Sequence, residues 1–209
     1  MERVARHYNW LSMLYDFLDW PFEQFRYPRI RRMLCSDLEG RVLDAGCGTG
    51  KNFPYYSPRA VVTAVDISEG MLVRAEHRAL GAKAKIEVLN MDATRLAFPD
   101  AAFDAVVSTY MFCVLPDAVQ RPALMELLRV TKPGGQVRIL EHRYSRRPWR
   151  RALMNLYTPY VRIFFHSRYD HPIGDVVRSS GARIIGEKYV TSDIEKLYIL
   201  SPADQKRAG

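Results

Sequence analysis

The residues with the clearest chemical potential are three alternating glycines that follow an apolar run. Residues 42–50 read Val-Leu-Asp-Ala-Gly-Cys-Gly-Thr-Gly, so the glycines come directly after Asp44. Glycine has no Cβ, and alternating glycines therefore let a turn tighten and leave backbone N–H groups open to a ligand. A dinucleotide-binding G-x-G-x-x-G turn would need its third glycine at the position of Lys51, whereas here it comes one residue earlier, at Gly50. The spacing predicts a cofactor site of another kind.

Two further acidic residues stand where neighbouring strands are expected to end. Asp66 follows the apolar run Val61–Val65 and lies 22 residues beyond Asp44, and Asp92 follows the run Ile86–Met91. A carboxylate about 20 residues past a glycine turn, at the tip of the adjacent parallel strand, can accept hydrogen bonds from both ribose hydroxyls. A carboxylate at the next strand end can take an adenine amino group. The three acidic strand ends together favour a site for an adenosine-containing ligand.

The pattern D-x-G-x-G-x-G, with these acids at fixed spacing, resembles the S-adenosylmethionine-dependent methyltransferases of the Rossmann-like class I. The resemblance implies S-adenosylmethionine as cofactor and no metal site. It implies that Met71, one turn into the helix that Ser68 is expected to cap, packs on the adenine ring. The expected cofactor-binding residues are Tyr8, Asp44, Gly46, Cys47, Gly48, Gly50, Asn52, Asp66, Ile67, Met71, Asp92, Ala93 and Ser108.

Strand-like and helix-like segments alternate from residue 41 to about 142, which predicts an α/β fold with a parallel sheet and helices on both faces. Two late apolar segments, Arg183–Val190 and Ile194–Leu200, are expected to add an antiparallel pair. The fold class is therefore a Rossmann-like, seven-stranded, mostly parallel sheet flanked by helices. The earlier strands are expected at 42–44, Val61–Val65, Ile86–Met91, Phe103–Ser108 and Gln136–Glu141.

At 209 residues the chain is long enough for one domain with a full core. We expect residues 1–40 to form an N-terminal helical lid and residues 41–209 the cofactor-binding domain. No apolar run reaches the length of about 18 residues that a membrane span requires, and no signal-peptide core follows the N-terminal charges. Three cysteines without a C-x-x-C pair fit a reducing compartment. The expected location is the cytoplasm, with peripheral contact at the inner membrane face.

Positive charge is concentrated in one segment of this chain, whose formal net charge is +8. Arg143–Arg168 holds seven arginines and no Asp or Glu, interleaved with aromatic residues. A helix starting near Pro148, which Pro159 should bend or break, would gather Trp149 and Tyr157 on one face. One interpretation is a helix packed on its own sheet with a solvated basic face. The other is a segment that binds an anionic membrane surface; nucleic acid would suit the charge but is disfavoured because no RNA-binding module is added.

The N-terminal segment is rich in aromatic residues, with eight between Tyr8 and Tyr27. This density predicts a lid over the cofactor and an apolar acceptor. Tyr8-x-Trp10, the turn 49–56 and the strand end Glu141-His142 resemble bacterial phospholipid N-methyltransferases, which methylate phosphatidylethanolamine. Alkyl-thiol and quinone-ring methyltransferases share some of these elements, so they stay open as alternatives. A small RNA methyltransferase and a non-catalytic S-adenosylmethionine-binding subunit are the alternatives from other classes.

The acceptor must lose a proton, because an amine with a pKa near about 10 or a thiol near about 8.5 is protonated at neutral pH. A tyrosine hydroxyl or an imidazole near the methyl group could accept that proton. The candidate catalytic residues are Tyr15 from the lid, and Tyr110 and His142 from strand ends, which line the crevice of such sheets. Tyr169 and His171 are expected to be loop or surface residues. The sequence alone leaves the acceptor and the oligomeric state open.

Overall fold

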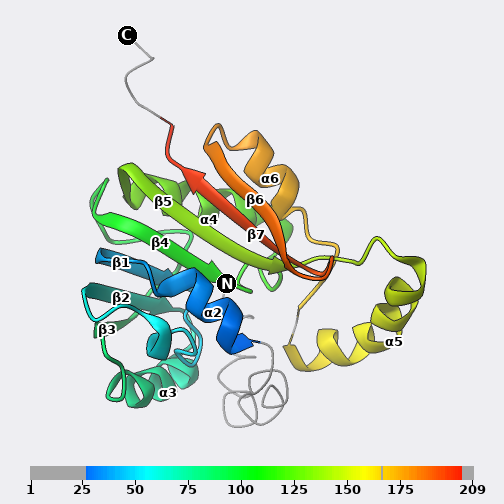
Figure 1. Cartoon of the computed structure of the whole chain (residues 1–209), viewed down its shortest axis with the longest axis horizontal. Helices are drawn as coiled ribbons and strands as arrows, with labels where there is room; N and C mark the ends of the chain where they lie inside the picture. Colours follow the sequence, from blue (N-terminus) through cyan, green and yellow to red (C-terminus); the bar gives the residue numbers. More distant parts are fainter. Residues whose placement is uncertain (1–26, 166, 204–209) are drawn as a thin grey trace.

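The computed structural model describes residues 27–165 and 167–203 (Figure 1). The roles expected of Tyr8 and Tyr15 lie outside the described residues, as does most of the expected lid. Within residues 27–40 the chain forms helix α2 (Tyr27–Cys35).

Seven strands form one sheet in the order β3-β2-β1-β4-β5-β7-β6 (Figure 1). The first five are parallel to one another, while β7 runs antiparallel to both β5 and β6. The predicted seven-stranded, mostly parallel sheet with a terminal antiparallel pair is confirmed. The strands are β1 (Gly40–Ala45), β2 (Ala60–Asp66), β3 (Lys85–Asn90), β4 (Phe103–Thr109), β5 (Thr131–His142), β6 (Arg183–Thr191) and β7 (Glu195–Ser201).

Helices cover both faces of the sheet because successive strand residues point to opposite sides. In β1, Val42 belongs to the core under α2 and α3 (Glu69–Ala79), whereas Leu43 belongs to the core under α4 (Asp117–Val130) and α6 (Ile173–Ser179). In β4, Val107 and Val106 divide in the same way. The remaining elements are η1 (Phe53–Tyr55) and α5 (Pro148–Phe165).

Two local expectations can be compared with the structure. Ser68 caps α3 as predicted, since its hydroxyl accepts a hydrogen bond from the Met71 backbone N–H at 3.3 Å. β5 begins at Thr131, five residues before the predicted start. The early start is possible because a register shift at Phe103 lets β4 pair with Thr131 before the regular ladder begins.

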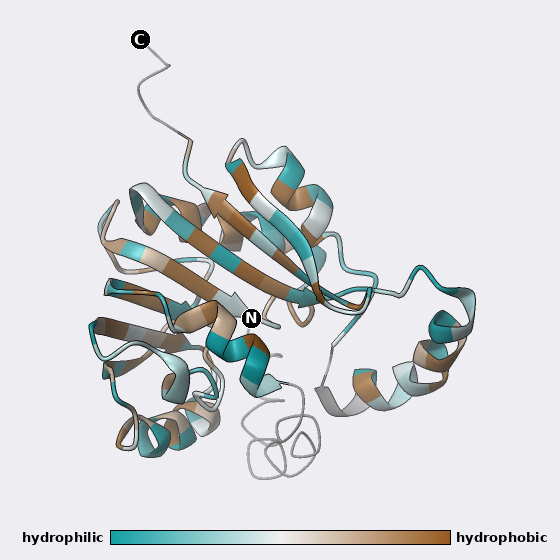
Figure 2. Cartoon of the chain, in the orientation of Figure 1, coloured by the Kyte–Doolittle hydropathy of each residue, from teal (hydrophilic) through white to brown (hydrophobic). Residues whose placement is uncertain are grey.

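Helix α5 differs most from what its sequence suggested. It runs unbroken through Pro159, although it changes direction along its length (Figure 1). The interpretation of a helix packed on its own sheet is wrong. Trp149 is 58% exposed, Leu156 75% and Tyr157 62%, while Met154 is buried. The helix stands away from the sheet (Figure 1), hydrophobic positions recur along it (Figure 2), and most of the apolar side chains described on it are exposed.

In the part of the chain that the structure describes, no helix is both long enough and apolar enough to cross a bilayer.

Candidate active site

The three predicted acidic residues lie along one edge of the sheet. β1 and β2 pair in parallel with Asp44 beside Ala64, and β2 and β3 pair with Asp66 beside Asn90, two residues before Asp92. Because the strands are parallel, their carboxyl ends meet at this edge. The structure thus brings together residues that lie far apart in the sequence.

The glycine loop follows β1, and all three of its glycines adopt positive φ: +70° at Gly46, +55° at Gly48 and +77° at Gly50. A Cβ at Gly46 would lie 2.7 Å from the Met111 side chain, and one at Gly50 would lie 2.5 Å from the ring of Phe53. At Gly48, by contrast, no atom of a described residue lies within 4 Å of an added Cβ. Two glycines therefore serve packing, and Gly48 is the position where the loop backbone borders space that no other described residue fills.

Asp66 joins the glycine loop to helix α3. One carboxylate oxygen accepts a hydrogen bond from the Gly48 backbone N–H at 2.9 Å, and the other accepts from the Ser68 N–H at 2.9 Å. Burial raises the pKa of Asp66, while these two backbone donors act against that rise. The side chain is half-buried, and each oxygen keeps lone-pair capacity for a ligand hydroxyl.

Asp44 is fully buried and is held entirely by protein groups. Its carboxylate accepts hydrogen bonds from the Tyr56 hydroxyl at 2.9 Å and from the Asn52 side-chain amide at 3.1 Å. The Asn52 carbonyl in turn accepts a bond from the Arg31 guanidinium at 2.6 Å. Burial raises the pKa of Asp44 to about 6. Asp44 and Asn52 thus brace the loop from behind, and Tyr56 and Arg31 are site residues that sequence reasoning did not name.

The other expected cofactor contacts have different exposures. Ile67 and Asp92 are half-buried, whereas Met71, Ala93 and Cys47 are buried. One oxygen of Asp92 accepts bonds from the backbone N–H and the hydroxyl of Thr94, at 2.8 and 2.7 Å. The second oxygen of this carboxylate accepts no hydrogen bond from a described residue.

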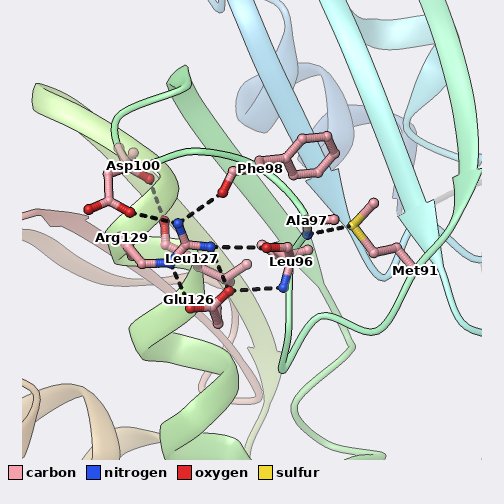
Figure 3. A network of polar contacts seen from close by, with 9 residues as sticks. Met91, Leu96, Ala97, Phe98, Asp100, Glu126, Leu127 and Arg129 are labelled. Carbon is pink, nitrogen blue, oxygen red and sulfur yellow. Dashed lines mark hydrogen bonds and ion pairs between the residues drawn. The ribbon is translucent and has the colours of Figure 1, made fainter.

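Arg129 of α4 holds the loop that follows Asp92 (Figure 3). Its guanidinium donates to the carbonyls of Leu96 at 3.1 Å and Phe98 at 2.9 Å, and to the Glu126 carboxylate at 2.7 Å. Glu126 also accepts a bond from the Leu96 N–H at 2.9 Å. Two half-buried side chains of α4, Glu126 and Arg129, therefore set the position of the loop that follows the third acid.

The other predicted strand-end residues gather at the ends of β4 and β5. The ring of Tyr110 stacks on the imidazole of His142 with 4.2 Å between centroids. Tyr110 has a φ of +56°, which is unusual for a residue with a side chain. Among described residues, the buried hydroxyls of Ser108 and Tyr110 have no hydrogen-bond partner.

Glu141 fixes the backbone just after Tyr110. Its carboxylate accepts hydrogen bonds from the N–H groups of Phe112 at 2.7 Å and Cys113 at 3.2 Å. Burial raises the pKa of Glu141 to about 8 despite these donors. His171 lies in a loop, as expected, but its side chain is buried, with Nε2 2.7 Å from the carbonyl of His142. Burial lowers the pKa of His171 to about 4. The loop is buried at this point because residues 167–172 lie against the end of β5.

Comparison with known proteins identifies the class. Residues 42–135 match the family model described as a methyltransferase domain. The chain is 31% identical over 165 residues to the ubiquinone/menaquinone biosynthesis C-methyltransferase UbiE of Syntrophotalea carbinolica, covering 77% of this chain and 67% of that protein. The chain belongs to the class I S-adenosylmethionine-dependent methyltransferases, enzymes that use S-adenosylmethionine as methyl donor.

Another relative differs in its acceptor. Over 105 residues the chain is 41% identical to the phosphatidylethanolamine N-methyltransferase of Cereibacter sphaeroides, a match that covers 49% of this chain and 51% of that protein. The chain therefore spans about half the length of that relative. A solved S-adenosylmethionine-dependent methyltransferase from Aquifex aeolicus has a TM-score of 0.63 at 21% identity, covering 87% of this chain and 92% of its own, which shows the shared fold.

The residues present fit the cofactor. The open space at Gly48, the half-buried carboxylates of Asp66 and Asp92 and the orphaned Ser108 hydroxyl lie along the same sheet edge. Asp66 would hold the ribose hydroxyls and Asp92 the adenine amino group. Within the described ranges, no cluster of three or more His, Cys, Asp or Glu side chains is arranged to hold a metal ion.

Proposed function

We propose that this protein methylates the amino group of phosphatidylethanolamine at a membrane surface. Two observations support the choice of acceptor: the relative that is 41% identical over 105 residues carries the name of that activity, and α5 has an outward apolar and basic surface. The observation that carries the proposal is the exposed apolar and basic surface of α5. An acceptor anchored in a bilayer can be reached only by a protein that binds to the membrane surface.

The surface of α5 has the composition of an interfacial helix. Trp149, Leu153, Leu156 and Tyr157 are at least half exposed, and no acidic residue occurs between 143 and 168. Tryptophan and tyrosine suit the headgroup level of a bilayer, and each arginine near anionic lipid contributes on the order of 1 kcal/mol. Asp193 pairs with Arg150 at 2.9 Å, so not every arginine of the segment is available. The result would be reversible peripheral binding.

The chemistry asks the protein mainly for placement. S-adenosylmethionine supplies an activated methyl group, so that a new N–C bond forms as the donor's C–S bond breaks, with the electron pair left on sulfur and one proton released from the amine. The side chains at the ends of β4 and β5 would orient the amine and exclude water. His142 and Tyr110 are the proposed groups that hold or pass on the proton, and the glycine loop with Asp66 would hold the donor.

The test of the activity is direct. The full-length protein is incubated with methyl-labelled S-adenosylmethionine and vesicles containing phosphatidylethanolamine, and the labelled lipid is identified by mass spectrometry. Labelled mono- or dimethylated phosphatidylethanolamine is expected. Parallel incubation with demethylmenaquinone tests the quinone alternative suggested by the Syntrophotalea relative, and label in the quinone alone would refute the proposal.

The membrane part has its own test. Arg147→Gln with Arg162→Gln should weaken binding to anionic vesicles by up to about 30-fold, because two contributions of about 1 kcal/mol are lost. Lys83→Gln with Lys85→Gln, an equal charge change on exposed residues at the β3 edge, should leave binding unchanged. The difference should shrink as salt rises, since exposed charges are screened beyond about 8 Å at physiological ionic strength. Equal sedimentation of both variants would contradict this role of α5.

A further inference from the structure

A row of five aromatic rings runs beside the candidate acceptor site. Tyr27 lies 5.6 Å from Tyr110, Tyr110 stacks on His142 at 4.2 Å, and His142 lies 6.0 Å from Tyr169, all measured between centroids. Tyr144 continues the row at 5.3 Å from Tyr169. Neighbouring rings outside the central stack are turned by 49° to 72°, so the row presents faces in several directions. The rings come from α2, from the ends of β4 and β5, and from the loops that follow β5 and precede α6.

The two outer rings already bind cations. The Arg31 guanidinium lies over Tyr27 at 5.6 Å, and that of Arg151 lies over Tyr144 at 5.0 Å. Aromatic faces attract cations through the negative face of the ring quadrupole. No described lysine or arginine lies over Tyr110 or Tyr169, the tyrosines on either side of His142. Tyr110 and Tyr169 therefore have cation-binding capacity that no described lysine or arginine uses.

The electrostatic surroundings of the middle rings include a buried acid. Glu195 is 1% exposed and pairs with His142 across β5 and β7. The pKa of Tyr110 is raised well above its ordinary value, mainly by burial, with Tyr27 and Glu195 adding to the effect and Arg31 opposing it. The negative charge of Glu195 thus acts on the Tyr110 ring, and the positive charge of Arg31 acts against it.

The position of Tyr110 is fixed by the backbone. Its N–H donates a hydrogen bond to the carbonyl of Leu140 at 2.9 Å, and its φ is +56°. The Glu141 carboxylate accepts hydrogen bonds from the N–H groups of Phe112 and Cys113, which follow two and three residues later. Non-glycine residues with positive φ cost free energy and cluster at functional sites. Among described residues, the buried Tyr110 hydroxyl has no hydrogen-bond partner.

We propose that Tyr110 and Tyr169, with His142 between them, bind the acceptor nitrogen in its methylated, cationic forms. This inference rests on the proposed function and specifies how its substrate is recognised. Each methyl group added to an ethanolamine nitrogen makes the cation bulkier and less hydrated, and aromatic faces bind such cations well. The row therefore favours the partly methylated lipid over the unmethylated one and supports successive transfers.

The test uses the full-length protein with S-adenosylhomocysteine and two soluble probes. One is diheptanoylphosphatidylcholine, and the other is its isostere with a 3,3-dimethylbutyl group in place of choline, which keeps the phosphate but lacks the ammonium charge. Calorimetry on the wild type should show a preference of about 5- to 30-fold for the cation. Tyr110→Leu and Tyr169→Leu should each reduce that preference several-fold, whereas Tyr110→Phe, which keeps the ring, should retain it. Tyr189→Leu, outside the row, is the matched control.

The outcomes separate the two proposals. Equal affinity of the wild type for both probes would overturn the aromatic site, as would an undiminished preference in the leucine variants. Methylation of phosphatidylethanolamine without cation preference would leave the proposed function standing and the aromatic site refuted. Cation preference that is lost in Tyr110→Leu, in a protein that does not methylate this lipid, would support the site and refute the proposed acceptor.

Discussion

Replacing Asp66 by alanine is the most informative single change at the cofactor edge. It removes the acceptors of two backbone hydrogen bonds, from Gly48 and from Ser68, each 2.9 Å long. A hydrogen bond to a charged group contributes about 1.5–3 kcal/mol, and the partly exposed N–H groups recover some of this from water. The variant should lose about 2–3 kcal/mol of unfolding free energy.

The same change should weaken cofactor binding by about 30- to 150-fold, or about 2–3 kcal/mol, if the carboxylate also holds the ribose hydroxyls. Chemical denaturation measures the first effect, and calorimetry with S-adenosylhomocysteine measures the second. Asp104→Ala is the control, because this carboxylate also accepts a backbone hydrogen bond, from the Arg41 N–H at 2.8 Å, but lies at the start of β4, at the opposite end of the strands from the cofactor edge.

A second ligand separates a ribose contact from a merely disordered loop. The 2′-deoxy analogue of S-adenosylhomocysteine should bind the wild type more weakly than the parent compound. In Asp66→Ala the two ligands should bind alike, because the partner of the hydroxyl is gone. A folded Asp66→Ala protein with unchanged affinity would refute the reasoning, as would an equal 2′-deoxy penalty in both proteins.

Three further changes test other parts of the structure. The pKa of Glu141 is about 8 in the folded protein and near 4.5 in the unfolded chain, so at a pH between these two values folding takes up a proton. The free energy of unfolding should therefore fall by up to about 2 kcal/mol from pH 6.5 to 8. Urea titrations at several pH values should show a smaller fall in Glu141→Gln. Gly46→Ala should lower the free energy of unfolding more than Gly48→Ala does, because the added methyl group meets the Met111 side chain. Gly48→Ala should lose more affinity for S-adenosylhomocysteine in calorimetry. A larger loss of affinity in Gly46→Ala than in Gly48→Ala would contradict the role of Gly48 at the ligand. Arg129→Met should weaken S-adenosylhomocysteine binding severalfold, because it removes the hydrogen bonds that hold the loop after β3. Unchanged affinity would show that the loop keeps its position without these hydrogen bonds.

The cofactor edge could be predicted because its information is local in the chain. Alternating glycines, an apolar run before each acid and the 22-residue separation of Asp44 and Asp66 are properties of short segments, and parallel pairing then brings the strand ends together. The same locality explains why the Ser68 cap was predicted correctly. The role of Asp44 could not be predicted, because its partner Tyr56 is recognised only once the loop has folded back over β1.

The acceptor side depended on contacts between distant segments. Tyr27, Tyr110 and Tyr169 come from α2, the end of β4 and the loop before α6, and no spacing in the sequence relates them. The burial of His171 and the exposure of α5 were likewise decided by packing. A helix with an apolar face is equally stable against a sheet or against another apolar surface, because the hydrophobic effect has no direction. The sequence determined that α5 would be amphipathic; only the tertiary structure, which already covers both faces of the sheet with other helices, left that face outward.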